Sequence, residues 1–504
     1  MADAVLNPLH VILTLAVTVL LIQLYRKLQQ RSPYPPGPRG LPLIGNVLDM
    51  PTSHEWRRFA EWGEKYGDIV YLNLLGQPMV ILNSAPHASA LLDKRGDVYS
   101  DRPVLAMSGE LVGWSRSLVL LPYGERFRTY RRYIARWIGG HAQVARHVGL
   151  TEREADRLLL RLRDEPKDFR AHVRKFVGAI VLNITYGYDV REGADPIVEA
   201  VDRATDQFSA ITSPGAFLVD VFPVLRYLPS WVPGARFKKQ LPEYRRTIDA
   251  MADLPFDFVK AQMAKQIDTP SLTSLLLRTE MQTEQNEFNI KWAATSLYGG
   301  GADTTVSAID SFFLAMTLYP DVQRRAQAEI DAVVGPQRLP ISADRANLPY
   351  IEALIKEVLR WNPVAPLGVA HRVTRDDFYE GYLIPKNTLV IANIWKILHD
   401  PDVYLDPFAF NPSRYLAAQT TPVAPDPKLF VFGFGRRICP GMHLADATLF
   451  ITCARVLATF TISKAVENGQ VLTPEPEYTS GTISHPKPFK CKIEPRSGVA
   501  KNIA

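Results

Sequence analysis

The sequence predicts a mainly α-helical protein with a minor β region. Three observations predict this class. From about residue 124 to 330, apolar residues recur mostly at helical spacing. Residues 68–83 and 378–395 instead contain short runs rich in β-branched and aromatic side chains. Of the 504 residues, 47% are hydrophobic and 22% charged, an ordinary globular composition that excludes a disordered chain, a fibre and a polytopic membrane protein.

Residues 1–31 are predicted to form a single-pass membrane anchor with a basic flank. Residues 8–25 contain no Lys, Arg, Asp or Glu, and a helix of that length spans about 27 Å, close to a hydrocarbon core. Arg26, Lys27 and Arg31 follow, so the positive-inside rule places the rest of the chain in the cytosol. A cleaved signal peptide is the alternative, but no basic n-region precedes the span and no small-residue cleavage site follows it.

Residues 32–46 are predicted to be a Pro-rich hinge. Four prolines between residues 33 and 38 fix φ and remove backbone donors, which favours a stiff extended spacer. The remaining residues, 47–504, contain no internal repeat and no second linker, so we expect one large domain. Asn183 begins a glycosylation sequon, which we interpret as chance because a cytosolic domain does not meet the glycosylating enzymes.

The predicted strands surround the helical part. Residues 68–83 are broken at Gly76-Gln77-Pro78, which indicates a hairpin. Residues 378–395 are typical of short strands, and the last thirty residues are Pro-rich and strand-like.

Two further segments each allow two interpretations. The apolar, proline-broken residues 213–237 fit a loop that dips into a bilayer or one that packs on the core. A basic helix carries Arg126, Arg128, Arg131, Arg132 and Arg136. It is either a solvated face or a docking site for an acidic partner. The net charge of +6 is mild on a chain of this length and does not identify a partner.

The cysteine with the most distinctive surroundings is Cys439. It follows the glycine turn of Gly433 and Gly435 and directly precedes a predicted helix. Free backbone amides and the positive end of the helix dipole favour a thiolate there, which serves as a nucleophile or a metal ligand. His443 is four residues away, but the sequence does not place it as a base. Three cysteines are too few for a disulfide framework and indicate a reducing compartment.

The pattern Phe432-x-x-Gly435-x-Arg437-x-Cys439-x-Gly441 resembles the haem-binding signature of the cytochrome P-450 monooxygenases. The resemblance implies the P-450 fold and a bound haem b (iron protoporphyrin IX), with Cys439 as the axial ligand of the iron. Electron donation from such a thiolate favours O–O cleavage.

The segment from Gly299 to Thr305 resembles the oxygen-binding helix of that family. Gly301 and its small neighbours let a flat ligand approach the helix backbone. Asp303 and Thr304 resemble the acid–alcohol pair that delivers protons to oxygen. The alternative is that the glycines serve helix packing and the threonine bonds back to its own helix.

Further resemblances concern structure and haem contacts. Glu357 and Arg360 match the family's E-x-x-R, and Arg414 is the expected third member of this structural lock, although Ser413 and Tyr415 depart from the commonest letters. Arg437, Arg131 and His371 are the expected propionate contacts. Phe127 stands where the family has a tryptophan, so one N–H donor is lost while ring packing is kept.

The resemblance covers essentially the whole chain and is to microsomal (class II) members, of the fungal secondary-metabolism or xenobiotic-oxidising kind. It implies a monomer in the endoplasmic reticulum membrane that takes electrons from NADPH through NADPH–cytochrome P-450 reductase. It further implies insertion of one oxygen atom from O₂ into a small hydrophobic substrate, either a terpenoid, a steroid or a polycyclic aromatic. A non-oxygenase haem-thiolate isomerase or dehydratase, or a haem sensor, is the alternative. We expect no nucleic-acid partner.

By family position the expected pocket residues are mostly apolar, and several are small. They are Ser296, Leu297, Val364, Ala365, Leu367, Val369, Thr482 and Ile483.

Overall fold

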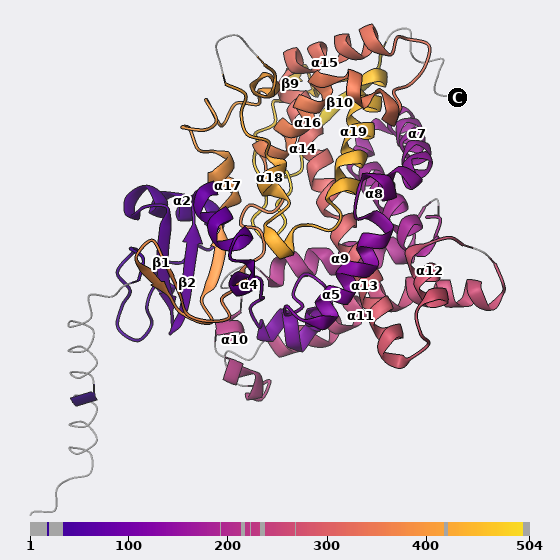
Figure 1. Ribbon diagram of the computed structural model, residues 1–504. Coiled ribbons are helices and arrows are strands. Elements are labelled where there is room, and N and C mark those ends of the chain that lie inside the picture. The colour runs from indigo at the N-terminus through magenta and orange to yellow at the C-terminus, as the bar shows by residue number, and fades with distance from the viewer. Residues whose placement is uncertain are drawn as a thin grey trace, which may run out of the picture.

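Helices make up most of the computed structural model (Figure 1). It describes residues 18–19, 34–191, 193–212, 217–221, 223–231, 237–267, 269–417 and 422–496. The longer helices are α2 (Glu55–Tyr66), α5 (Glu125–Ile138), α7 (Val148–Asp164), α8 (Phe169–Tyr186), α9 (Pro196–Ile211), α11 (Phe237–Ala264), α12 (Leu272–Thr279), α13 (Glu284–Ala302), α14 (Thr304–Leu318), α15 (Pro320–Val333), α16 (Pro349–Trp361) and α19 (Met442–Thr459). The shorter ones are α3 (Ala85–Ala88), α4 (Gly96–Tyr99), α6 (His141–Val144), α10 (Leu218–Val221), α17 (Ile394–Leu398) and α18 (Lys428–Val431).

The largest sheet has the strand order β1-β2-β6-β3. Its strands are β1 (Ile69–Leu74), β2 (Gln77–Leu82), β6 (Leu389–Ala392) and β3 (His371–Arg372). The hairpin expected over residues 68–83 is confirmed, with β1 antiparallel to β2. Its turn lies one residue earlier than expected, at Leu75 and Gly76, which both have positive φ, so Gln77 and Pro78 belong to β2.

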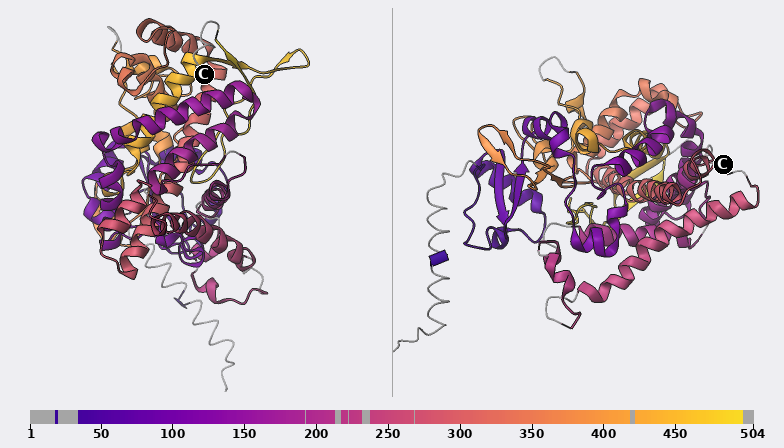
Figure 2. Two further views of the ribbon diagram at one scale, coloured as in Figure 1. Left: turned by 90° about the vertical axis from the view of Figure 1, so that its right-hand side faces the viewer. Right: turned by 60° about the horizontal axis from the view of Figure 1, so that its bottom comes forward.

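The remaining strands form three two-stranded sheets. These pair β4 (Asp377–Tyr379) with β5 (Tyr382–Ile384), β7 (Phe460–Lys464) with β10 (Cys491–Pro495), and β8 (Val466–Glu467) with β9 (Gln470–Val471). The β8–β9 hairpin projects from the body (Figure 2). The strands expected over residues 378–395 are thus present, and the helical character expected from residue 124 to 330 is confirmed by α5 to α15.

The core centres on two consecutive helices, α13 and α14. Every residue of α14 from Thr305 to Thr317 is buried. Helices α5, α8, α9, α11 and α12 pack against α13, and α8, α16 and α19 pack against α14. Helix α14 and the second half of α13 therefore run through the interior, which explains why their sequence is mostly apolar or small.

Among the described residues, no helix is both long enough and apolar enough to cross a membrane. Of the expected anchor only residues 18 and 19 are described, so the anchor prediction lies almost wholly outside the described residues.

The apolar segment 213–237 is described only in part, as α10 and the short helix η7 (Pro223–Tyr227) with the residues around them. Phe217, Leu225 and Leu228 pack against the core. Val224, Tyr227 and Trp231 are largely exposed, at 68%, 77% and 81%. Packing on the core is thus confirmed for three side chains of this segment, and contact with a bilayer stays a prediction for the exposed ones.

Candidate active site

Cys439 lies in the loop between the one-turn helix η10 (Gly435–Arg437) and α19. Its backbone N–H donates to the carbonyl of Phe432 at 2.8 Å, which closes the loop on itself. The glycine at 435 is required, because its φ is positive and a Cβ there would collide with the carbonyl oxygen of Leu92. The loop thus holds one thiol at the start of a buried helix, as the signature predicts.

The protonation of this thiol differs from the expectation based on the helix terminus alone. Burial raises the pKa of Cys439, although a backbone hydrogen bond from Gly441 and the charge of Arg131 lower it. The loss of water outweighs the helix amides, so the surroundings alone do not stabilise the thiolate. A cation placed directly on the sulfur would favour the thiolate over the thiol.

The helix α13–α14 is interrupted at Asp303 and opens inward just before the break. Gly300 is exposed and a Cβ built there meets nothing within 4 Å, although α13 is otherwise a core helix. Gly301, the glycine expected to face a ligand, would instead bring its Cβ to within 3.1 Å of a Val181 methyl group. The open side of the helix is therefore at Gly300.

Asp303 and Thr304 lie at the interruption but point to different partners. The Thr304 hydroxyl donates to the carbonyl of Gly300 at 2.8 Å. The Asp303 carboxylate contacts Arg174 and His485. Burial opposes its ionisation, but the hydrogen bond and charge of His485, together with Arg174, hold the pKa of Asp303 below its usual value.

Two residues of α16 and one residue of the later short helix η9 (Pro412–Tyr415) form a buried cluster of charges, the expected structural lock. Arg360 donates two hydrogen bonds to Glu357, at 2.8 and 2.9 Å, and both side chains are fully buried. Arg414 lies 3.2 Å from the same carboxylate. The three residues whose spacing resembled a structural lock are thus in mutual contact.

A group of basic side chains is buried close to the Cys439 loop. Arg437 is 8% exposed and donates to the carbonyls of Ser100 and Leu121. Arg131 donates to the carbonyl of Ile438. Burial lowers the pKa of Arg437 to about 10, and the neighbouring charge of Arg131 contributes.

His371 belongs to the same group. Its Nδ1 lies 2.6 Å from the carbonyl oxygen of Tyr99, so Nδ1 is the donor. Burial and the charge of Arg102 hold the pKa of His371 well below its usual value. The ring is therefore neutral, and it donates through Nε2 only if a nearby anion favours a second proton.

Arg102 is a member of this group that the sequence analysis missed. It is 6% exposed and donates to the carbonyls of Val119, Val369 and Ala370. Burial and repulsion from Arg437 hold its pKa well below the usual value. The available signal was an arginine in an otherwise ordinary Asp-Arg-Pro stretch, which does not reveal contacts with residues 17 to 268 positions away.

These residues fit a haem group. Among the described residues, no carboxylate forms a salt bridge with Arg102, Arg131 or Arg437, so their charges await an anion. Two propionates would supply it. The iron would supply the cation that the buried Cys439 thiol needs in order to ionise.

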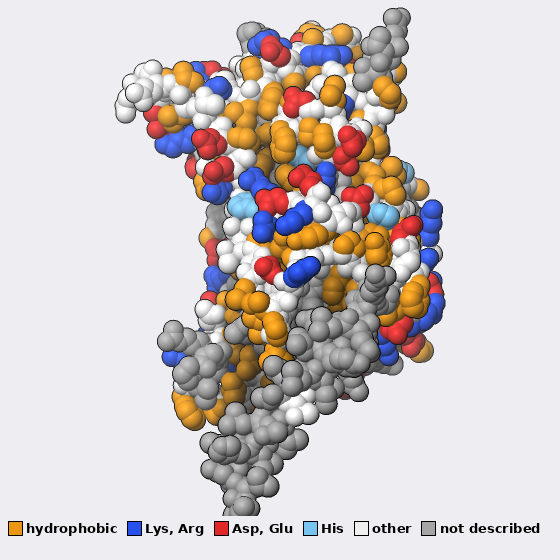
Figure 3. Space-filling view, turned by 90° about the vertical axis from the view of Figure 1, so that its left-hand side faces the viewer, with side chains coloured by type: hydrophobic (Ala, Val, Ile, Leu, Met, Phe, Trp, Pro, Cys, Tyr) orange, Lys and Arg blue, Asp and Glu red, His pale blue; other side chains and the backbone are white. Residues whose placement is uncertain are grey.

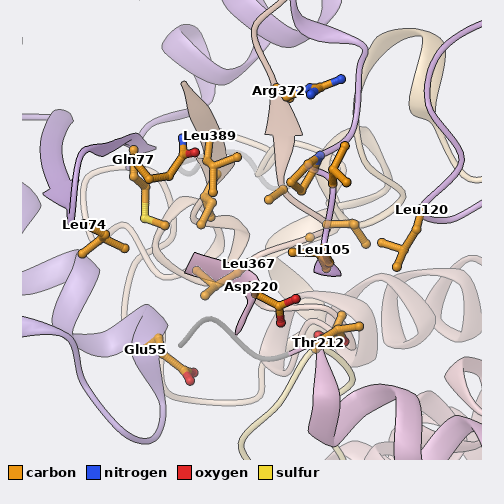
Figure 4. A pocket seen from close by; sticks show the side chains of 18 of the residues that line it. Glu55, Leu74, Gln77, Leu105, Leu120, Thr212, Asp220, Leu367, Arg372 and Leu389 are labelled. Atoms are coloured by element: carbon orange, nitrogen blue, oxygen red, sulfur yellow. Dashed lines mark hydrogen bonds between the residues drawn. The ribbon is translucent and has the colours of Figure 1, made fainter. Parts of the chain in front are cut away.

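A cavity of about 410 Å³ lies between the β1–β2–β6 sheet and the helical part (Figure 4). Leu74, Met79 and Leu389 line it from the sheet, and Leu105, Leu120 and Phe208 from the other side. Of the eight expected pocket residues, Leu367, Val369 and Thr482 line it. Ser296 instead uses its hydroxyl to bind the backbone of Leu118 and Trp292, and Leu297 and Ile483 are buried.

The chain belongs to the cytochrome P-450 family. The family model for cytochrome P-450 matches residues 35–493. The chain is 52% identical to cytochrome P-450 monooxygenase 208 of Postia placenta, over 98% of both chains. It is 46% identical to cytochrome P-450 monooxygenase claR of Ampulloclitocybe clavipes (97% and 90% covered) and 41% identical to tryptamine 4-monooxygenase of Psilocybe cyanescens (93% and 94% covered). The protein is thus a haem-thiolate monooxygenase of fungal type that binds haem b, and the non-oxygenase alternative is not the one supported.

Proposed function

We propose that this P-450 inserts one oxygen atom from O₂ into a small hydrophobic molecule of the terpenoid, steroid or polycyclic aromatic class. The observation that carries this proposal is the cavity of about 410 Å³, whose volume suits a small ligand and whose lining combines many apolar side chains with Glu55, Asp220 and Arg372. Val369 and Ala370 line the cavity and also accept hydrogen bonds from Arg102, which connects it to the basic group of the site. One relative is, by its name, a tryptamine 4-monooxygenase, which supports an aromatic ring system among the candidates.

The residues of the site divide the work of holding the haem. Cys439 would bind the iron, and Arg102, Arg131, Arg437 and His371 would bind the propionates. Haem ligated by a thiolate supplies the activation of O₂ and the cleavage of its O–O bond. Phe432, Gly435 and Gly441 keep the loop in the shape that presents the sulfur.

The proposed task of Asp303 and Thr304 is to supply protons. The helix break at Asp303 leaves Thr304 partly exposed although it lies in the interior. A hydroxyl in that position both accepts and donates a hydrogen bond, and an acid next to it in sequence provides the proton. The contact from Thr304 to the Gly300 carbonyl is the resting arrangement in this proposal.

Electrons are proposed to come from NADPH through NADPH–cytochrome P-450 reductase, docked on α5. Arg126, Arg128, Arg132 and Arg136 of this helix are exposed, while Arg131 points inward to the Cys439 loop. Helix α5 thus presents positive charge to an acidic partner and, through Arg131, also contacts the cysteine loop.

We further propose that the enzyme is anchored in the endoplasmic reticulum membrane by residues 1–31 and acts as a monomer with a cytosolic catalytic domain. Leu43, Leu48, Tyr227 and Trp231 are at least 75% exposed, which suits contact with lipid. On the face that carries the β1–β2 sheet, hydrophobic side chains are mixed with charged ones in the upper half, and a further hydrophobic group lies at the lower left (Figure 3).

The test combines spectra and turnover. The purified full-length protein, reduced and treated with carbon monoxide, should give the red-shifted Soret band of thiolate ligation. Terpenoids, steroids and polyaromatics are then screened for a shift of the haem spectrum. Hits should support NADPH-dependent O₂ uptake with added reductase and yield a product one oxygen atom heavier. A protein with the correct band that oxidises no member of the three classes would contradict the substrate proposal.

For the membrane contact, the emission of Trp231 should be quenched by brominated lipids in vesicles. The signal should be lost in Trp231→Phe and kept in Trp292→Phe, which changes a buried tryptophan.

A further inference from the structure

Asp303 is held by a histidine from the far end of the chain. His485 Nε2 lies 3.1 Å from Asp303 Oδ2, and Arg174 Nη1 lies 3.3 Å from Oδ1. The Asp303 side chain is only 2% exposed. Both oxygens of the proposed catalytic acid are therefore hydrogen-bonded to these two partners, whereas the Thr304 hydroxyl bonds to the Gly300 carbonyl.

His485 and Asp303 belong to a cluster of seven ionisable groups from four parts of the chain. Helix α8 supplies two guanidinium groups, α9 two carboxylates, and the segment from α13 to α14 two more. The groups are Arg170, Arg174, Asp202, Asp206, Asp303, Asp310 and His485. The two arginines compensate the charge of only two of the four carboxyl groups. The remaining negative charge is neutralised by protons bound to the carboxyl groups or to His485.

Three of the four acids of this cluster retain their protons at higher pH than an ordinary aspartate. Burial raises the pKa of Asp202 to about 6, although Arg174 works against it. Burial also raises the pKa of Asp206 and of Asp310, whereas the pKa of Asp303 is lowered by His485 and Arg174. Protonated and ionised carboxyl groups therefore lie side by side in the cluster, as a path for protons requires.

The imidazole is fixed in place by its neighbours along the chain. The backbone N–H of His485 donates to the Thr479 hydroxyl at 2.9 Å. On either side, the Ser484 carbonyl accepts from Ser307 on α14, and the Pro486 carbonyl accepts from Arg170 on α8. The backbone around His485 is thus anchored to both helices, and the ring stays within hydrogen-bond distance of Asp303, as a proton donor must.

The other ring nitrogen of His485, Nδ1, offers a route by which the imidazole regains a proton. His485 Nδ1 is buried and has no hydrogen-bond partner among the described residues, and the same holds for Asp310 Oδ1. The two side chains interact electrostatically. Buried polar atoms of this kind are where ordered water enters proteins, and water connects such groups to solvent.

We propose that His485 is the proton donor to Asp303, so that protons for oxygen reduction enter the acid–alcohol pair through this imidazole. In the step the ring begins as imidazolium, the Nε2–H bond breaks, its electron pair stays on the nitrogen, and an O–H bond forms at Asp303 Oδ2, which leaves a neutral imidazole and a neutral carboxyl group. The ring regains a proton from solvent water before the next turnover. No electrons move, and the proposal rests on the acid–alcohol role given under the proposed function.

The deciding variant is His485→Gln. The glutamine amide places an N–H near the position of Nε2, so it preserves the hydrogen bond but does not release the proton. We expect O₂ uptake to continue while product per NADPH falls about tenfold and peroxide rises in its place. The solvent deuterium isotope effect on product formation should increase. The carbon monoxide band should stay unchanged, which shows that the site is intact.

The matched control is His172→Gln on α8, a buried histidine whose Nε2 lies 2.9 Å from the Glu165 carbonyl. It should couple NADPH to product like the wild type. If His485→Gln also couples like the wild type, a hydrogen bond alone is sufficient and the proposal is overturned.

A second measurement does not depend on turnover. In the reduced, carbon monoxide-bound protein labelled with ¹⁵N-histidine, the His485 signal is assigned by its loss in His485→Gln. The chemical shift of its Nε2 should change in Asp303→Asn, because the hydrogen bond from Nε2 then meets an amide in place of a carboxylate. An Nε2 signal that is the same with and without the carboxylate would overturn the proposal. A wild type that takes up no O₂ would instead refute the proposed function.

Discussion

The guanidinium carbon of Arg437 lies 3.9 Å from the centre of the Phe127 ring. Phe127 is the residue at which this chain departs from the tryptophan of its family. Arg437 is buried, and burial lowers the pKa of its guanidinium group. The face of an aromatic ring stabilises such a cation without supplying a full negative charge. The departure therefore loses an indole donor but keeps the contact that orients Arg437.

Replacing Phe127 tests this contact. Phe127→Ala should lower the haem-to-protein ratio and destabilise the fold by about 3–5 kcal/mol, because a buried ring and its cation–π contact are both lost. Phe127→Trp should retain haem at least as well as the wild type. The measurements are the haem content by absorbance and the unfolding midpoint. Equal haem retention in Phe127→Ala would contradict the assigned role.

The buried lock should respond strongly to the loss of its single acid. Glu357→Gln leaves Arg360 and Arg414 with uncompensated buried charge, and we expect a loss of about 3–5 kcal/mol in stability with little holoprotein recovered. Glu61→Gln removes the acid of the exposed pair with Arg58 and should cost less than about 1 kcal/mol. Chemical denaturation of both variants checks this, and equal effects would refute the lock.

The Thr304 hydroxyl is expected to couple oxygen reduction to product formation. Thr304→Ala should keep O₂ uptake but divert it to peroxide, because the hydroxyl that passes on the proton is gone. Thr304→Ser keeps a hydroxyl and should restore most of the coupling. Product and peroxide are measured per NADPH consumed. Unchanged coupling in Thr304→Ala would show that the relay does not run through this residue.

The raised pKa of Asp202 predicts a pH dependence of stability. The folded state holds a proton up to about pH 6, whereas the unfolded chain releases it near the ordinary value of 3.8. The folded state therefore binds more protons within this window, and the contribution of Asp202 to stability falls as pH rises through it. Asp202→Asn should be relatively more stable above pH 6 than at pH 4. Unfolding midpoints across this range decide, and parallel curves for variant and wild type would contradict the prediction.

The exposed arginines of α5 should govern the interaction with the reductase. Charge reversal in Arg126→Glu with Arg132→Glu should raise the reductase concentration needed for half-maximal turnover about tenfold at low salt, and less at high salt. Arg58→Glu on α2 serves as the control, because it reverses an equally exposed charge on another helix. Turnover at saturating reductase should be unaffected. A double variant with unaltered reductase demand would exclude α5 as the docking site.

The residues predicted best from sequence were those whose partners are close in sequence or fixed by a motif. The Cys439 loop and the Glu357–Arg360 pair are local, and Arg414 was placed by resemblance. Arg102 and His485 were not predicted, because their roles come from contacts across more than 180 residues. The effect of burial on the Cys439 pKa was not predicted, for a related reason. A helix terminus can be recognised in sequence, but the loss of water around a side chain depends on the whole fold.

The close approach of Gly435 to Leu92 has a consequence for how the enzyme is assembled. The Gly435 N–H also binds the Asp93 carboxylate, so the cysteine loop takes its final shape only against a segment more than 340 residues earlier in the chain. We therefore expect haem to bind late in biosynthesis, after both segments have been synthesised and have packed together. Fragments released early from the ribosome should be colourless, and haem shortage should leave an open intermediate exposed to degradation.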